Sequence, residues 1–349
     1  MSGVEHLLRS LRSHGRACAA LGSPMYGELL DRVAADVEAG GIFAAILAGH
    51  ENDPGRLALP LRLLGGLHRL VLDGRAPTLR RWYPSTGGTW DAEAAWPDIM
   101  LAAANHFSPL RAALDQPPQT NEVGRSAALI GGLLILDRRF GLPVRLFEIG
   151  SSAGLNLRAD RYHYRYRGGQ WGPPDSPVTI DDAWHGRLPP GGALQIVERQ
   201  GYDIAPVNAT SADGELTLLS YVWPDMAARL DRLRGAIGVA RQVPARLQRC
   251  AAADAVAGLA VADGALTVLW HSITWQYLSA SEQVAVRDGI DALAAQAEAR
   301  APFAHLMLEP QRRTSGAPHA FLLRARCWPG GMDQILAECA PHGPPVTWE

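Results

Sequence analysis

The chain contains no lysine, so all 33 of its basic Lys and Arg residues are arginine. Walker A phosphate loops, pyridoxal-phosphate enzymes and Schiff-base aldolases all depend on a lysine amine, so the sequence excludes these three kinds of site. The formal net charge of -2 gives no overall attraction to nucleic acid or to an anionic membrane. We therefore expect a small-molecule substrate rather than nucleic acid or membrane as the partner.

Several other patterns are absent from the sequence. The cysteines form no C-x-x-C pair, which argues against a disulfide framework and against a thiolate metal site. H-x-H, H-E-x-x-H and H-x-x-E-H do not occur, so we predict no catalytic metal. The longest apolar run, Ser126 to Leu136, is too short to cross a bilayer, and arginines replace the apolar core of a signal peptide. We expect a cytoplasmic protein, and the sequence gives no indication of its oligomeric state.

Two rhythms divide the chain. Ala and Leu recur at helical spacing from Gly3 to about Arg139, whereas apolar strand-like runs alternate with helical stretches after Gly141. The second rhythm is typical of a parallel sheet with crossover helices. We predict an α/β fold, with an N-terminal helical region over residues 1–119 that covers the site. Residues 120–349 are predicted to form a Rossmann-like, mostly parallel sheet of the class I methyltransferase type.

Two local features of the second region lead to separate predictions. Residues 160–192 are rich in Tyr, Trp, Gly and Pro and are predicted to be an insertion; the alternation in "DRYHYRYR" indicates a hairpin with its tyrosines on one face. Near the C-terminus, "AFLLRARCW" and "PVTWE" are predicted strands, and "MDQILAECA" between them is predicted to be a short helix.

The stretch "RLFEIGSSAGLNL" fits two catalytic motifs. Gly150, Ser152 and Gly154 form the G-x-S-x-G nucleophile elbow of α/β-hydrolases, which would make Ser152 a nucleophile. Together with Glu148 they also form the acid-plus-glycine loop by which Rossmann-like methyltransferases hold S-adenosylmethionine, with serine in place of the middle glycine. Both motifs require a buried strand, a tight turn and a helix starting near Ala153, so local structure does not choose between them.

The rest of the chain favours the methyltransferase interpretation. A hydrolase builds several strands before its elbow and supplies oxyanion-hole amides from an earlier loop, whereas the region before Glu148 is helical in pattern. Glu148 interrupts an apolar strand, and a buried carboxylate without a partner is costly, so a cationic ligand would explain it. A protein that keeps this fold and binds a nucleotide or an S-adenosyl ligand without catalysis remains an alternative.

Further acidic and aromatic residues complete the predicted site. Asp203 follows the second strand candidate, where an acid accepts hydrogen bonds from ribose hydroxyls, and Asp254 follows the third, where it would accept from the adenine amino group. His271 leaves the fourth strand and is the candidate base. The candidate substrate residues are Tyr221, Trp223, Trp275 and Tyr277.

From about Thr120 onwards, the chain resembles the bacterial family known as domain of unknown function 2332. The resembling stretches include "TNEVGR", "FEIGSSAGLNLRADRYHYRY", "ERQGYDIAPVNAT", "LTVLWHSITWQYL" and "HGPPVTW". The resemblance implies a shared fold and a shared site, and it assigns no activity. Family members often carry "GASAGLNL" where this chain has "GSSAGLNL", so Ser152 rather than Ser151 is the residue that both motifs must explain.

Overall fold

The structure is a computed structural model that describes residues 3–349. The described chain divides into two compact units, the first made of residues 3–120 and 211–231 and the second of residues 121–210 and 232–349. The long helix α9 (Ala227–Gln242) has residues in both units. Among the described residues, none of the helices combines the length and the apolar character needed to cross a membrane.

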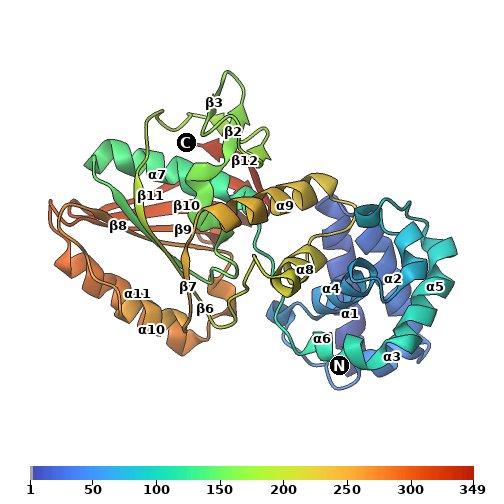
Figure 1. The fold of residues 1–349 in the computed structure, drawn as a ribbon. Helices are drawn as coiled ribbons and strands as arrows, with labels where there is room; N and C mark the ends of the chain where they lie inside the picture. Colours follow the sequence, from blue (N-terminus) through green and yellow to red (C-terminus); the bar gives the residue numbers. More distant parts are fainter. Residues whose placement is uncertain (1–2) are drawn as a thin grey trace. The chain divides into compact units, whose positions relative to one another are not determined.

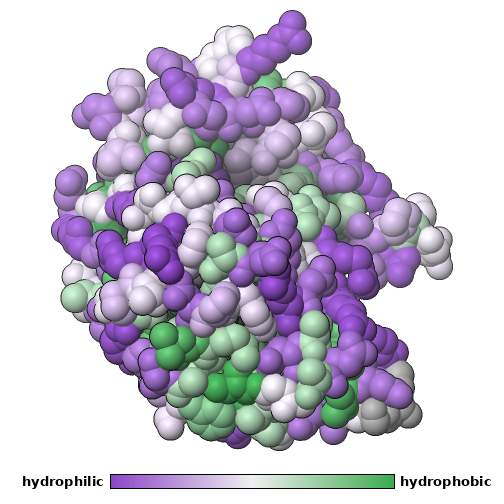
Figure 2. All heavy atoms as spheres, turned by 90° about the vertical axis from the view of Figure 1, so that its right-hand side faces the viewer, coloured by the Kyte–Doolittle hydropathy of each residue, from purple (hydrophilic) through white to green (hydrophobic). Residues whose placement is uncertain are grey.

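The first unit is helical, and no strand occurs among its described residues (Figure 1). Its helices are α1 (Gly3–Ala20), α2 (Pro24–Glu38), α3 (Ile42–Leu47), α4 (Leu59–Leu72), α5 (Ala92–Asn105), α6 (Phe107–Leu114) and α8 (Ala212–Ser220), with the 3-10 helices η1 (Gly55–Leu57), η2 (Pro77–Arg81) and η3 (Pro84–Thr86). The helical rhythm of the sequence is explained by burial, because α4 turns Leu63, Leu67 and Leu70 into the core of the unit. The surface in Figure 2 is mainly hydrophilic, with one apolar cluster in its lower part.

The second unit is built on a nine-stranded mixed sheet with the order β5-β12-β11-β10-β9-β8-β1-β6-β7. Its strands are β1 (Val144–Ile149), β5 (Trp184–Gly186), β6 (Ile196–Asp203), β7 (Arg246–Arg249), β8 (Leu266–Ser272), β9 (Phe303–Arg312), β10 (His319–Trp328), β11 (Met332–Ala340) and β12 (Gly343–Trp348). The stretch from β7 to β9 is parallel, whereas β10, β11 and β12 continue the sheet as antiparallel strands. The α/β class with a large, mostly parallel sheet is thereby confirmed.

Helices cover the sheet of the second unit on two sides (Figure 1). On one side lies α7 (Ser126–Phe140), which contacts β9, β10, β11 and β12. On the other lie α10 (Ala252–Ala257) and α11 (Ala280–Gln296), whose Val256, Val286 and Ile290 pack against Phe147 and Leu269 of the sheet. The central strands are therefore buried on both faces, as their nearly continuous apolar sequences require.

The segment between the first two parallel strands forms a small sheet of its own. Strands β2 (His163–Tyr166) and β3 (Gly169–Trp171) make an antiparallel hairpin, and β4 (Thr179–Ile180) pairs with β2 in parallel. Tyr162 and Tyr164 are fully buried, so the predicted hairpin with a tyrosine face is confirmed. The next strand, β5, pairs with β12 and extends the large sheet.

The prediction of a helix over "MDQILAECA" is wrong. These residues form β11, which pairs with β10 on one side and β12 on the other. Gly330 and Gly331, both with positive φ, make the reversal that leads from β10 into β11. Glutamine, leucine, alanine and glutamate favour a helix in isolation, but the pairing partners on both sides outweigh that weak local preference.

Candidate functional site

The candidate site lies at the carboxyl edge of the central parallel strands. β1 is flanked by β6 and β8, and both run parallel to it, so all three end at the same edge. The five parallel strands lie side by side in the order β7-β6-β1-β8-β9. Numbered by their order along the chain, this is 3-2-1-4-5. The second and third strands are added on one side of β1 and the fourth and fifth on the other, so the strand order reverses at β1. A crevice that can bind a ligand opens at such a point.

Glu148 is the first polar side chain at this edge. It lies near the end of β1 beside Trp270 of β8, and its residue is only 2% exposed. Neither its Oε2 nor the indole Nε1 of the neighbouring Trp270 makes a well-formed hydrogen bond among the described residues, although the indole is near enough to favour the ionised carboxyl. Burial raises the pKa of Glu148 to about 8, and the charge of Asp203 adds to that rise; the Trp270 indole acts in the opposite direction. The carboxyl is thus poised to ionise when a cation or a donor arrives.

The turn after β1 has the backbone that the motif predicts. Gly150, Ser152 and Gly154 all have positive φ, at 66°, 51° and 62°. A side chain at Gly150 would overlap Thr274, since a Cβ there would lie 2.3 Å from Oγ1 of Thr274. Gly154 is similarly enclosed by Leu247. Glycine is required at both positions for conformation and for space, and Ser152 occupies a left-handed conformation that glycine would adopt more readily.

Asp203, at the end of β6, holds this turn in place. Its Oδ2 accepts a hydrogen bond of 2.8 Å from the backbone amide of Ser152, and its Oδ1 accepts one of 2.8 Å from the amide of Ala205. The turn is also tied to β6 through the amide of Ser151, which donates to the carbonyl of Tyr202 at 3.1 Å. The structure thus brings Glu148, the glycine turn and Asp203 together.

The helix expected directly after the turn differs from the prediction. Residues Leu155–Arg161 form the 3-10 helix η5, with non-helical dihedral angles at Arg158. The amide of Leu155 is bound by the side chain of Asn121 at 2.8 Å, and the buried guanidinium of Arg158 donates to the carbonyl of Gly154 at 2.7 Å. These two side chains, together with backbone bonds such as the one from the amide of Val207 to the carbonyl of Ser152, take the place of a regular α-helix after the turn.

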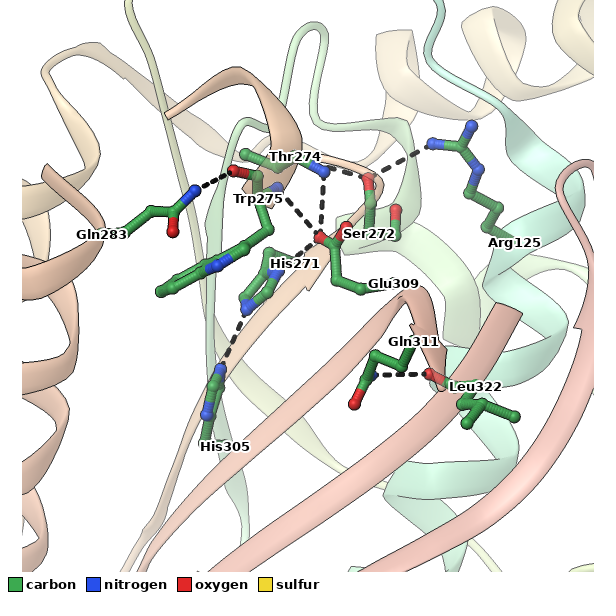
Figure 3. A network of polar contacts seen from close by, with 10 residues as sticks. All are labelled: Arg125, His271, Ser272, Thr274, Trp275, Gln283, His305, Glu309, Gln311 and Leu322. Carbon is green, nitrogen blue, oxygen red and sulfur yellow. Dashed lines mark hydrogen bonds and ion pairs between the residues drawn. The ribbon is translucent and has the colours of Figure 1, made fainter. Parts of the chain in front are cut away.

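A second polar cluster lies under the loop that follows β8 (Figure 3). Nδ1 of His271 lies 2.7 Å from Oε1 of Glu309, and Nε2 of His271 lies 3.0 Å from Nε2 of His305. All three side chains are buried. The same Glu309 oxygen accepts from the backbone amides of Thr274 and Trp275 at 2.9 and 3.2 Å. Glu309 therefore fixes both the imidazole of His271 and the start of the loop.

The hydrogen-bond pattern places a hydrogen on Nδ1 of His271. Glu309 Oε1 already receives two amide protons, so it acts as an acceptor and Nδ1 of His271 carries the hydrogen. Nε2 of His271 and Nε2 of His305 share one hydrogen, which His305 donates when His271 is neutral and His271 donates when it is charged. Burial holds the pKa of His305 well below its usual range, and His271 acts in the same direction. Both ring nitrogens of His271 are thus engaged within the protein.

Aromatic residues of the following 3-10 helix, η6 (Trp275–Tyr277), cover this cluster. The indole of Trp275 stacks on His271 with ring centroids 5.6 Å apart, and the guanidinium of Arg287 lies over the Trp275 ring, 5.1 Å from its centroid. Gln283 anchors the loop by donating to the carbonyl of Trp275 at 3.1 Å. Tyr277 is 47% exposed at the surface. The structure therefore brings His271 and Trp275 into contact at the carboxyl edge.

The remaining predicted site residues divide between the two units. Asp254 is exposed in the first turn of α10, directly after β7. Burial raises the pKa of the nearby Cys250 thiol, and the charge of Asp254 raises it further. Tyr221 and Trp223 belong to the first compact unit. There Trp223 is buried beside Tyr26, with ring centroids 6.3 Å apart, and Tyr221 packs against Gly65. These two aromatics contribute to the packing of the helical unit.

Sequence reasoning missed Glu309, His305 and Arg158. Glu309 and His305 interrupt an apolar strand, four residues apart and on one face, which is the same signal that drew attention to Glu148. Arg158 carried no such signal, because arginine after a turn is usually solvated. No cluster of three or more His, Cys, Asp or Glu side chains suited to a metal ion occurs among the described residues.

Comparison with known proteins identifies the family. The chain matches the family described as "Uncharacterized protein conserved in bacteria (DUF2332)" over residues 9–348, and it therefore belongs to that family. The resemblance noted from the sequence is thereby confirmed, and it extends through the helical unit as well as the sheet. Neither the curated proteins nor the solved structures contain a match to the chain.

Proposed function

We propose that this member of the family binds S-adenosylmethionine at the carboxyl edge of β1 and β6 and transfers its methyl group to a small molecule. The observation that carries the proposal is the buried carboxyl of Glu148. It lies two residues before a turn through Gly150 and Gly154, and its Oε2 lacks a partner among the described residues. Such an oxygen fits a ligand that brings a cationic amino group, because the ligand would supply the missing donor.

The strand order supports the same location. Ligands of open α/β sheets bind beyond the carboxyl ends of the strands, where the chain direction switches, and β1 lies at such a point. In this proposal Glu148 accepts hydrogen bonds from the amino group of the cofactor and Asp203 accepts from its ribose. Asp203 already binds two amides, but a carboxylate has about four acceptor positions. The carboxylate of Asp254 would accept a hydrogen bond from the adenine amino group.

S-adenosylmethionine supplies, when bound, a methyl group on a positively charged sulfur. The residues of this chain then need to align the acceptor and exclude water. His271 was the predicted base, but both of its ring nitrogens are engaged by Glu309 and His305. We therefore assign His271 to positioning Trp275, whose ring stacks on it, and propose that Trp275 and Tyr277 shield the reacting groups.

The two alternatives make different demands on the same residues. A serine hydrolase would need a histidine nitrogen directed at Ser152, whereas those of His271 face Glu309 and His305. Its support is correspondingly weaker. A protein that binds an S-adenosyl ligand or a nucleotide without catalysis would use the same contacts as the methyltransferase. Only an assay of turnover separates these two.

Calorimetric titration of the full chain with S-adenosylmethionine, S-adenosylhomocysteine and adenosine nucleotides tests the proposal. We expect both S-adenosyl ligands to bind. Glu148→Gln should weaken their binding by about 10- to 100-fold, since a hydrogen bond to a charged partner contributes about 1.5–3 kcal/mol. The exposed Asp288→Asn on α11 is the matched control and should bind as the wild type does. Failure of the wild type to bind either S-adenosyl ligand would refute the proposal.

The pH dependence of binding gives a second readout. The pKa of Glu148 is about 8, so the carboxyl is mostly protonated at pH 7 and must release a proton when a cationic group binds. Affinity should therefore rise as the pH increases from 6 to 8, and calorimetry in buffers of different ionisation enthalpy should detect the released proton. Glu148→Gln should abolish this release. Binding without methyl transfer to a broad panel of acceptors would favour the non-catalytic alternative.

A further inference from the structure

We propose that the helical unit carries a second chemical site, an acyl-transfer centre in which Ser85 is the nucleophile and His68 is its base. Oγ of Ser85 lies 2.8 Å from Nε2 of His68, and Nδ1 of His68 lies 3.1 Å from the carbonyl oxygen of Ser220. The three residues come from η3, α4 and α8, all within the first compact unit. This centre is independent of the methyltransferase proposal, because it shares no residue with it.

The carbonyl of Ser220 decides which nitrogen of His68 is basic. A carbonyl oxygen only accepts hydrogen bonds, so Nδ1 of the neutral imidazole must carry the hydrogen. Nε2 then holds the lone pair, and the hydroxyl of Ser85 has to donate to it. This is the arrangement of an activated nucleophile, in which a base accepts from the hydroxyl and a third group orients the base.

The burial of the two residues agrees with His68 as the base and Ser85 as the nucleophile. His68 is fully buried, and its ring stacks on Tyr83 with centroids 5.6 Å apart and an interplanar angle of 28°. Ser85 is only half-buried and lies on a surface turn. The base is thus held in one orientation inside the unit, while the residue that carries the nucleophilic oxygen is partly exposed.

The turn that presents Ser85 is held by its own hydrogen bonds. The single hydroxyl hydrogen of Thr86 is shared between the carbonyls of Arg80 and Tyr83, 2.8 and 2.9 Å from Oγ1, and the amide of Gly88 donates to the carbonyl of Tyr83 at 3.0 Å. Gly87 has a φ of 83°, a conformation that favours glycine. This closed turn limits the freedom of Ser85 and keeps its hydroxyl directed at His68.

The chemistry uses only groups on this chain and an ester substrate. Oγ of Ser85 forms a bond to the acyl carbon of the ester while its proton moves to Nε2 of His68. The C–O bond to the leaving alcohol then breaks, and the alcohol takes that proton. Water attacks the acylated serine by the same route, which releases the carboxylic acid and restores Ser85. No oxidant, metal or cofactor is needed.

The orienting group predicts the class of substrate. A backbone carbonyl fixes the tautomer as an aspartate does, but it carries no charge to stabilise the imidazolium that forms during attack. The centre should therefore act on activated acyl donors, such as aryl esters with good leaving groups, and should not cleave amides at a useful rate.

Fluorophosphonate labelling of the full chain tests this site, because attack on the reagent forms a bond from Oγ to phosphorus and expels fluoride. We expect peptide mapping by mass spectrometry to locate the label on Ser85, and p-nitrophenyl acetate to be hydrolysed. Ser85→Ala should abolish both reactions. His68→Gln should slow labelling by about 100-fold or more, which is the smaller end of the contribution of a general base.

The controls keep a folding defect apart from a chemical one. Ser108→Ala changes an exposed serine of α6 and should label and hydrolyse as the wild type does. Thermal unfolding should show Ser85→Ala folded, since Ser85 is half-buried and lies on a turn. Absence of label from Ser85 in the folded wild type, or equal hydrolysis by Ser85→Ala, overturns the proposal. Label on Ser152 instead would identify the sheet as the hydrolytic site and would contradict both proposals.

Discussion

The backbone amide of Ser152 donates a 2.8 Å hydrogen bond to Oδ2 of Asp203, and this bond joins the turn after β1 to the end of β6. The second oxygen of Asp203 binds the amide of Ala205. The acid therefore has a structural role that exists without any ligand. A change at Asp203 will affect the fold and the binding of a cofactor together, and an experiment has to separate the two effects.

We expect Asp203→Ala to lower the free energy of unfolding by about 2–4 kcal/mol, because two amides lose a charged acceptor. S-adenosylhomocysteine should bind it roughly 30- to 1,000-fold more weakly than the wild type. Urea denaturation and calorimetry measure the two effects, with the exposed Asp288→Ala as the control.

A ligand variant isolates the ribose contact of Asp203. If Asp203 accepts from the ribose, the wild type should lose affinity when the 2′-hydroxyl of S-adenosylhomocysteine is replaced by hydrogen. Asp203→Asn should lose much less on the same replacement, because its affinity for the unmodified ligand is already reduced. Equal losses in both proteins would show that Asp203 acts through the turn alone.

The buried carboxyl of Glu148 should make the protein less stable as the pH rises. Burial raises its pKa from 4.5 to about 8, so between these values the folded chain holds a proton that the unfolded chain has released. The free energy of unfolding should fall with increasing pH in this window, by at most about 1.4 kcal/mol per pH unit. Glu148→Gln lacks this contribution, so its stability relative to the wild type should increase from pH 5 to pH 8. A pH-independent difference in urea denaturation would contradict the burial argument.

His305 should act in the opposite direction on the acidic side. Burial first, and His271 next, hold its pKa well below the usual value of 6.5, so below pH 6.5 the unfolded chain gains a proton that the folded chain does not. This contribution is fully present above pH 6.5 and is lost as the pH falls. His305→Gln keeps an amide donor for His271, and its stability relative to the wild type should increase between pH 6.5 and pH 5. Urea denaturation at matched pH values measures the difference, and a constant difference would show that folding leaves the pKa of His305 unshifted.

The sequence predicted the elements whose burial leaves a strong pattern. β1, β6, β7, β8 and β9 lie where strand-like runs predicted them. All but the edge strand β7 have a neighbour on both sides, and β1, β8 and β9 are almost wholly buried. β11 was missed because it lies in the antiparallel part, where half of its residues face outward and its composition favours a helix. The pairing that makes it a strand involves residues far apart in the chain, and no local pattern reports it.

The candidate site was predictable in part for the same reason. The sequence indicated Glu148 and the glycine turn, since a buried acid and residues with positive φ are local requirements. The partnership between His271 and Glu309 depends on the register of β8 against β9, which the sequence does not reveal. The predicted role of the helical region as a cover for the site stays a prediction.

The last prediction concerns the left-handed conformation of Ser152, whose φ is 51°. A residue with a Cβ pays about 1–2 kcal/mol for this conformation, whereas glycine adopts it freely and loses about 0.5–1 kcal/mol through its more flexible unfolded chain. Ser152→Gly should therefore be more stable than Ser152→Ala, by about 0.5–1 kcal/mol, and the pair differs only in the Cβ. Gly150→Ala should behave in the opposite sense and destabilise strongly, because its Cβ would overlap Thr274. Urea denaturation of the three variants at one pH provides the comparison, and a Ser152→Ala protein more stable than Ser152→Gly would show that the backbone at this position is not left-handed.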